Sequence, residues 1–252
     1  AGLARVIVFG NGAIVEEINN SGVILANVTE ATDEVYADRD NVVAARDIQS
    51  IAIDIEAGGD VSRIVNSSTI SAGFTGRNGQ AVAIRDASGT LRVIENTGVI
   101  AAVAVNSDSL GLQTTNFDTI ALDLAANTAG VTLTQSLAVD EDTTDDITPT
   151  APSISGDILL GSGGDVVNVS AGTITGDLAM GDGMDSLILS GGSTYSGTLT
   201  DSDGLLTIAV SGGSTLAQSG AAALNVTEAS FDETSTFRPT LDGATGDATA
   251  IV

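Results

Sequence analysis

The sequence predicts an all-β protein folded as a right-handed parallel β-helix, or β-solenoid, with rungs of about 20–30 residues. Three observations predict this fold. A pattern of glycines and apolar residues recurs about every 20 residues in the second half of the 252-residue chain. Apolar and polar residues alternate within it, as in strands with one buried face. Aromatic residues are only 3% of the chain, whereas glycine occurs 30 times, which suits a narrow core with many turns.

The most regular repeats lie at residues 154–220. Serines 170, 190 and 211 hold the same place in successive repeats and mark their register. Parallel strands stack about 4.8 Å apart, so each repeat position becomes a column of like side chains. The predicted columns are Ile154, Ile174 and Tyr195; Ile158, Leu178 and Leu199; Val167, Leu187 and Ile208; and Val169, Leu189 and Val210.

Residues 1–138 carry the same pattern in longer rungs. Segments 18–24, 64–70 and 94–100 each begin with isoleucine, place an asparagine before a serine or threonine and end in isoleucine, and the last two lie 30 residues apart. We expect each asparagine to form a tight corner that visits the left-handed backbone region. The extra residues are expected to form loops, for example at 29–41 and 74–80.

Two other segments complete the predicted organisation. Residues 139–153 contain the acidic run Asp140–Asp146 and two prolines, so we expect a loop or linker there. Residues 221–252 form a C-terminal capping region, in which Phe231 and Phe237 cover the last rung. The whole chain would make about 9 to 12 rungs at the usual strand spacing.

The charged residues exclude several kinds of chemistry. The chain has 8 basic residues, all arginine, against 33 acidic ones, which gives a net charge of −25. Histidine, cysteine and lysine are absent, so a Ser-His-Asp triad, a thiol nucleophile and a lysine Schiff base are excluded. A surface this acidic repels phosphates, so no nucleic acid partner is expected.

Asp165, Asp182 and Asp185 are candidate metal ligands. They lie in two glycine-rich turns, 161–165 and 181–185, which resemble the calcium-binding turns of RTX β-rolls. Stacking would place Asp165 about 5 Å from Asp185, and a cation would relieve the repulsion between their carboxylates. RTX turns recur at about nine residues, however, so the alternative is a set of solvent-facing turn aspartates. Ca²⁺ is the only cofactor that the sequence suggests.

A carbohydrate-cleaving site is a second candidate, because paired carboxylates hydrolyse glycosidic bonds. Asp54 and Glu56 lie two positions apart on one predicted strand, and Asp123 could join them from a later rung. The alternative is a polar outer face opposite buried Ile53 and Ile55. No complete catalytic motif is present in the sequence, so we do not expect an enzyme.

The arginines suggest a third possibility. Seven of the eight lie between positions 1 and 92, a segment with a net charge of −5, while positions 93–252 carry −20. This asymmetry suggests head-to-tail or lateral self-association, in which arginines of one molecule meet acidic turns of the next. Such an assembly should dissolve in salt. Ordinary surface salt bridges are the alternative.

The repeats also carry a family resemblance. Gly-Asp-Ile-Leu-Leu-Gly-Ser-Gly-Gly-Asp at 156–165, Gly-Asp-Leu-Ala-Met-Gly-Asp-Gly-Met-Asp at 176–185 and two copies of Ser-Gly-Gly-Ser-Thr resemble the passenger domains of bacterial autotransporters (type V secretion). The resemblance covers nearly the whole chain. It implies export through the outer membrane to the bacterial cell surface, with the family's C-terminal membrane barrel outside this fragment.

Together, these observations predict a non-catalytic cell-surface or secreted passenger that acts as an adhesin, stalk or surface-assembly component. Its partners would be other copies of itself or a ligand on a host or neighbouring cell. Two alternatives remain: a secreted β-helix lyase or glycosidase acting on polysaccharide, and a calcium-binding RTX-like secreted protein.

Overall fold

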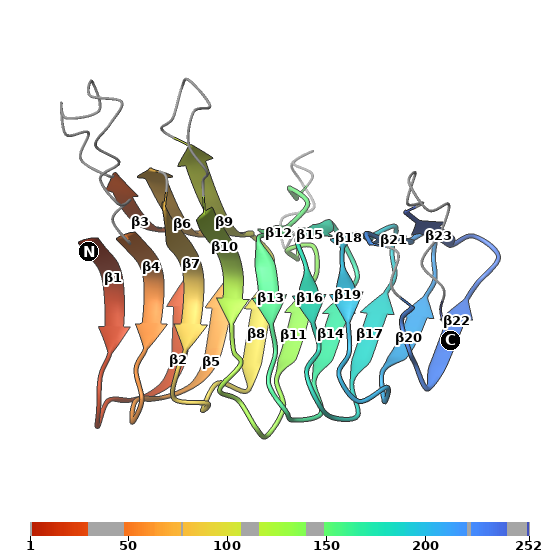
Figure 1. Cartoon of the computed structure of the whole chain (residues 1–252), viewed down its shortest axis with the longest axis horizontal. Coiled ribbons are helices and arrows are strands. Elements are labelled where there is room, and N and C mark those ends of the chain that lie inside the picture. The colour runs from red at the N-terminus through yellow and green to blue at the C-terminus, as the bar shows by residue number, and fades with distance from the viewer. Residues whose placement is uncertain are drawn as a thin grey trace, which may run out of the picture.

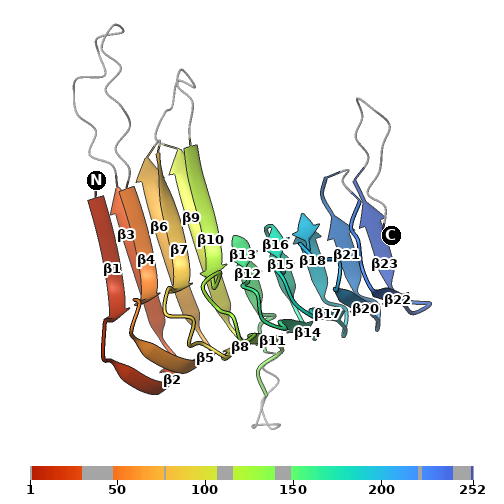
Figure 2. The ribbon, with the colours of Figure 1, turned by 60° about the horizontal axis from the view of Figure 1, so that its bottom comes forward.

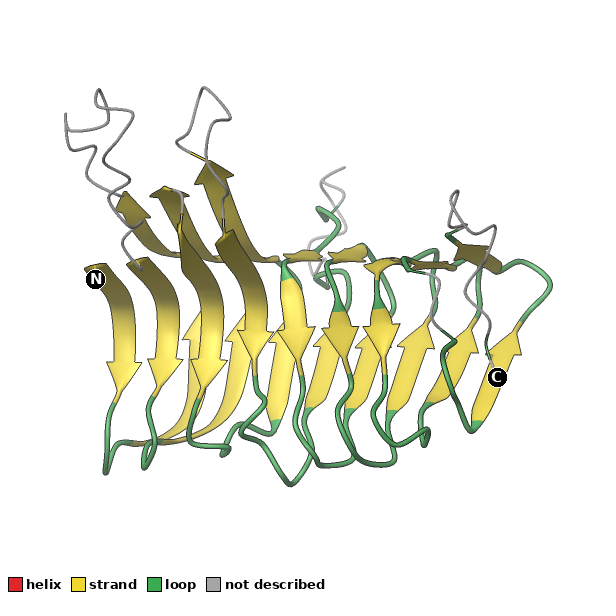
Figure 3. Cartoon of the chain, viewed as in Figure 1, coloured by secondary structure: helices red, strands yellow, loops and turns green. Residues whose placement is uncertain are grey.

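Three parallel β-sheets, which we name A, B and C, wind around one core in the computed structural model of the chain (Figure 1). The structure describes residues 2–29, 48–76, 78–106, 116–139, 149–220, 223–240 and 251. These residues form strands and turns but no helix (Figure 3). The predicted right-handed parallel β-helix is thereby confirmed.

Each of the first seven rungs contributes one strand to each sheet in turn, and the eighth contributes β22 and β23 to sheets B and C. In spatial order, sheet A contains β1 (Gly2–Phe9), β4 (Ile48–Ile55), β7 (Asn78–Asp86), β10 (Asn116–Asp123), β13 (Asp157–Leu159), β16 (Leu178–Ala179) and β19 (Leu199–Thr200). Sheet B contains β2 (Ile14–Asn20), β5 (Asp60–Asn66), β8 (Val93–Asn96), β11 (Thr132–Gln135), β14 (Val166–Val169), β17 (Ser186–Leu189), β20 (Thr207–Val210) and β22 (Glu228–Phe231). Sheet C contains β3 (Val23–Thr29), β6 (Thr69–Gly76), β9 (Val99–Asn106), β12 (Ser153–Ser155), β15 (Thr173–Thr175), β18 (Thr194–Gly197), β21 (Thr215–Gln218) and β23 (Thr236–Pro239).

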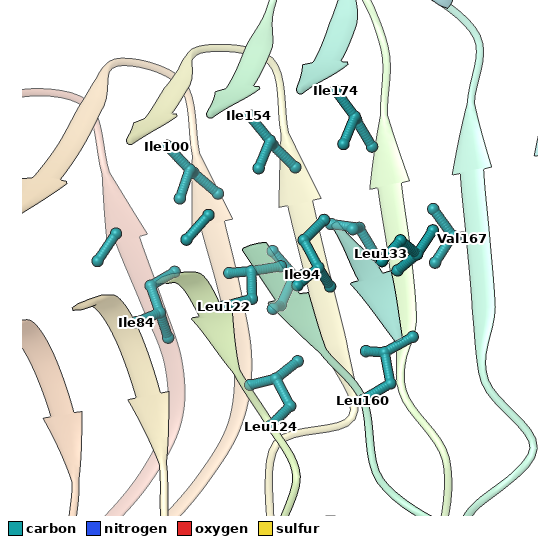
Figure 4. Packing of buried hydrophobic residues seen from close by; sticks show 14 of the residues in the cluster. Ile84, Ile94, Ile100, Leu122, Leu124, Leu133, Ile154, Leu160, Val167 and Ile174 are labelled. Carbon is teal, nitrogen blue, oxygen red and sulfur yellow. The ribbon is translucent and has the colours of Figure 1, made fainter. Parts of the chain in front are cut away.

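The core consists of aliphatic columns in the predicted register. Ile154 pairs with Ile174, which pairs with Tyr195, and all three side chains are buried. The other three predicted columns are likewise in register. Figure 4 shows the same inward packing nearer the N-terminal end of the stack, where Ile94, Leu133 and Val167 follow one another in sheet B. Burial of these aliphatic faces is the main stabilising contribution to the stack.

Extra residues of the early rungs lengthen their strands, which corrects one expectation. Strands β4, β6 and β7 have eight, eight and nine residues, whereas β13 to β21 have two to four. The loop expected at 74–80 is instead the end of β6 and the start of β7, with residue 77 outside the described ranges. Figure 2 shows these long strands at the N-terminal end. The described residues make eight rungs, fewer than expected, because each early rung uses more of the chain than a later one.

The asparagine corners use side chains rather than left-handed backbone, which corrects a second expectation. No described residue other than glycine has a positive φ. Instead, Asn20 donates to Asn66 (2.8 Å), Asn66 to Asn96 (2.8 Å) and Asn96 to Gln135 (2.9 Å). This buried amide ladder joins four successive rungs at the corner between sheets B and C. Each amide both donates and accepts, which is why asparagine recurs at this position.

The last described rung continues sheets B and C through β22 and β23. Phe237 stacks under Leu216 and packs against the core, and its ring centroid lies 5.9 Å from that of Phe231. The acidic run at 140–146, most of the loop expected at 29–41 and most of residues 241–252 lie outside the described residues. No helix in the described ranges is long and apolar enough to span a membrane.

Candidate functional site

The turns between sheets A and B bring Asp165 and Asp185 together as predicted, but not in solvent. Both are buried, with 0% and 2% of their surface exposed. Asp165 Oδ1 accepts the N–H of Val131 (2.6 Å), and Asp185 Oδ1 accepts the N–H of Asp165 (2.7 Å). The two carboxylates therefore satisfy backbone donors from one rung to the next. The alternative of solvent-facing turn aspartates is wrong for these two residues.

The second oxygen of each carboxylate has no partner in the structure. Burial raises the pKa of Asp165 to about 6, with the charge of Asp185 contributing. Burial likewise raises the pKa of Asp185 to about 6, and the nearby charges of Asp201, Asp203 and Asp182 act in the same direction. Loss of hydration disfavours the ionised form of a buried carboxylate. The pair therefore takes up protons near pH 6.

Asp182 is exposed and accepts a hydrogen bond from the Ser202 hydroxyl. The turn of the next rung adds Asp201, whose Oδ1 is also buried without a partner, and Asp203, which accepts the N–H of Gly183 (2.9 Å). Among the described residues, however, no group of three or more acidic side chains is arranged to hold a metal ion. Calcium binding at Asp165, Asp182 and Asp185 stays a hypothesis.

The proposed glycosidase carboxylates belong to an ion-pair column on sheet A. Both Asp54 oxygens are held by Arg85, whose Nε and Nη2 donate at 2.8 Å, and Arg5 donates to Oδ2 at 2.9 Å. Arg5 also binds Glu56. Asp123 pairs in register with Arg85, so it joins the same column one rung farther on. The side chain of Asp54 is fully buried, and a carboxylate held in this way is not available to attack a substrate.

Stacking on sheet B produces a groove that sequence reasoning missed. Arg63 lies between Glu17 and Glu95, with N···O distances of 3.5 and 2.7 Å. These pairs occupy neighbouring rungs because Glu17 pairs with Arg63 in the register of β2 and β5. The groove has a volume of about 510 Å³ and is lined by Glu16, Glu17, Ser62, Arg63, Arg92 and Val93. Only the register between rungs reveals it, since its charged side chains come from β2, from β5 and from the residue before β8, which are distant in the sequence.

The described arginines bear directly on the self-association hypothesis. Arg5, Arg63 and Arg85 each pair with acidic groups of their own chain, which favours ordinary salt bridges within one molecule. Arg92 donates to backbone oxygens of its own turn. Arg39, Arg46 and Arg77 lie outside the described residues. Self-association through arginines and acidic turns remains a hypothesis without support from these contacts.

Comparison of the chain with protein-family models, with characterised proteins and with solved structures gave no match.

Proposed function

We propose that this chain is a non-catalytic surface module: a passenger of the autotransporter type, exported to the bacterial cell surface, that works as an adhesin, stalk or assembly component. The observation that carries the proposal is the eight-rung stack itself, which presents three continuous sheet faces to its surroundings. A stack of this kind binds through extended faces, because each rung repeats the same exposed positions.

The disposition of the charged side chains supports a binding rather than a catalytic role. Arg5, Asp54 and Arg85 neutralise one another on sheet A, and Arg63 is shared between two glutamates on sheet B. Side chains tied into such pairs fix the register of neighbouring rungs and stabilise the faces. The polysaccharide-cleaving alternative would need Asp54 to leave two arginines, so we do not develop it.

Surface proteolysis tests the proposal. Intact cells of the source bacterium are treated with a protease that does not enter them, and the chain is followed with an antibody. The proposal expects cleavage on intact cells, while a cytoplasmic control protein stays whole. Protection of the chain until the cells are lysed would contradict surface display.

Binding and catalysis are then separated with the purified chain. Beads coated with the whole chain should retain cells or one another, and the soluble chain should release no reducing ends from a panel of neutral and acidic polysaccharides. Release of reducing ends that is lost in Asp54→Asn would replace the proposal with the enzyme alternative.

A further inference from the structure

Sheet C has the longest uncharged run of the three sheets, with seven successive strands against four in sheet B (β11, β14, β17 and β20). Strands β3, β6, β9, β12, β15, β18 and β21 contain no charged residue, and the described part of the sheet carries its only charge, Arg238, on the terminal strand β23. In a chain with a net charge of −25, seven successive uncharged strands form a distinct surface. The outward positions of the last five rungs are Ser153 and Ser155, Thr173 and Thr175, Thr194 and Ser196, Thr215 and Ala217, and Thr236 and Arg238.

Sheets A and B carry their charges on or beside their strands. Sheet A has the column of Arg5, Asp54, Arg85 and Asp123, and sheet B has acidic residues in its first three rungs and again at Glu228. The aspartate-containing turns at 161–165, 181–185 and 201–206 lie at the corner between these two sheets, whereas Asp157 and Asp177 lie at the corner between sheets C and A. Two copies that approach through the corner between sheets A and B bring carboxylates against carboxylates.

The first three rungs of the sheet C face expose apolar side chains on β3 and β9. Val23 and Leu25 on β3 are 69% and 49% exposed, and Val103 and Val105 on β9 are 47% and 52% exposed. Thr69, Ser71 and Thr75 lie between them on β6. The face therefore combines a valine-rich end with a hydroxyl-rich strip, and both consist of small, mostly β-branched side chains.

Its geometry favours a second copy of the chain as the occupant. The outward columns repeat at the spacing of the rungs, about 4.8 Å, and another face with that same spacing can interdigitate with them along its full length. Sheet C has strands of about eight residues in three rungs and of about three residues in the other five. The area of its outer face is therefore roughly 600 Å² per copy. A pair would bury roughly 1,200 Å², which is within the range of specific interfaces.

We propose that two copies of this chain pack face to face through the outer surface of sheet C. The proposal rests on the assembly role proposed above and names the partner and the face. The pair is isologous, with its two-fold axis along the stacks, so that long rungs face long rungs and the threonine strips face each other. Hydroxyl and methyl groups of the threonine strip meet across the interface, and the exposed valines lose contact with water.

The salt dependence of this dimer is opposite to that of an arginine–carboxylate assembly. Attraction across sheet C is uncharged, while the net charge of each copy opposes association. Salt screens that repulsion, so raising NaCl from about 0.02 M to about 0.5 M strengthens the dimer. Sedimentation velocity of the whole chain over a concentration series at both salt concentrations measures the dissociation constant.

A matched pair of variants locates the interface. Thr175 on β15 of sheet C and Thr132 on β11 of sheet B are both exposed, and each glutamate replacement adds one negative charge. Thr175→Glu should raise the dimer dissociation constant at least about tenfold, because symmetry buries two new charges. Thr132→Glu should change it by less than about threefold. Val103→Glu serves as a second disruptive variant, and circular dichroism confirms that each variant is folded.

Three results would overturn the proposal: a chain that stays monomeric at both salt concentrations, a dimer that dissociates as salt rises, or equal weakening by Thr175→Glu and Thr132→Glu. None of them bears on surface display, which the proteolysis of intact cells tests separately.

Discussion

Asp165 and Asp185 show why acidic residues occur in an otherwise apolar column. Val131 precedes Asp165 in the stack, and buried Leu206 takes the corresponding position in the rung after Asp185. The turn leaves a backbone N–H of the preceding rung directed inward, where a carboxylate accepts it. An unsatisfied buried N–H costs about 1–3 kcal/mol, so the aspartates remove one penalty while their second oxygens introduce another.

Because the pKa values of Asp165 and Asp185 are raised in the folded chain, protonation of the pair stabilises the fold at low pH. For each aspartate, the folded-state pKa of about 6 lies above the ordinary value of 3.8, so the folded chain binds protons more tightly than the unfolded chain. This contribution is complete below pH about 4 and is lost as pH rises through about 6. Asp165→Asn should therefore raise the free energy of unfolding at pH about 7.5 by about 1 kcal/mol and flatten its pH dependence. Urea unfolding across this pH range provides the measurement.

Exposed Asp60, which lies at the start of β5 three rungs before Asp165, supplies the control. Asp60→Asn removes the same charge away from the buried pair, so it should leave the slope of stability against pH unchanged. A loss of stability in Asp165→Asn at pH about 7.5, where an asparagine still accepts the Val131 N–H, would contradict the assignment.

At the scale of single residues, the sequence predicted the stacking of Asp165 on Asp185 but not their burial. The stacking follows from the period of the repeat. Burial depends on which way the turn directs each side chain, and Gly-rich turns with aspartates look alike in sequence whether the side chain points inward or outward. Asp182 and Asp185 lie in one turn, yet only Asp185 points inward.

At the scale of the elements, the amide ladder links the corners between sheets B and C of successive rungs through side-chain hydrogen bonds. Asn66 donates to Asn96, to Ser68 O (3.1 Å) and to Val99 O (3.1 Å), and it accepts from Asn20. The ladder ends at Gln135, which donates to backbone oxygens of the following rung. Its members satisfy one another across rungs, so loss of a central amide affects the rungs on both sides.

Asn66→Ala should therefore reduce the free energy of unfolding by about 2–4 kcal/mol, since several buried hydrogen bonds are lost together. Asn168→Ala is the control, because Asn168 lies at a partly exposed position of β14 and should cost less than about 0.5 kcal/mol. Urea unfolding of both variants measures the difference. Similar losses in the two would show that the ladder does not stabilise the corner.

Two glycines share a positive φ but differ in how closely the neighbouring rung packs against them. Alanine substitutions at these positions therefore distinguish the cost of backbone strain from the cost of a clash between rungs. Gly181 and Gly192 have positive φ values of 87° and 75°. A Cβ at Gly181 would lie 1.7 Å from Gly161 O, whereas one at Gly192 would meet nothing within 4 Å.

Gly192→Ala should therefore cost about 1–2 kcal/mol from backbone strain alone. Gly181→Ala should cost clearly more, because the two rungs must also move apart. Thermal unfolding ranks the two variants, and equal costs would mean that contact between rungs does not constrain this turn.

For the whole molecule, the distribution of charge determines the response to salt. The net charge of −25 destabilises the compact chain through self-repulsion, while only a few described acidic groups pair with arginine. We expect about 0.3 M NaCl to raise the melting temperature, since screening weakens repulsion more than it weakens these pairs. Measurement in dilute protein, where any dimer is dissociated, isolates the effect within the monomer. A fall in melting temperature would show that the ion pairs dominate.

The sequence by itself determined the fold class, the register of the later rungs and the columns of the core. These follow from local periodicity, because residues one period apart must stack once the chain coils into rungs of that length. It did not determine that asparagines form a ladder, that long rungs extend their strands, or that Asp54 lies between two arginines. Those features depend on contacts between distant parts of the chain, in rungs of unequal length. Only the tertiary structure decided which side chains meet there, and it brought seven uncharged strands side by side in sheet C.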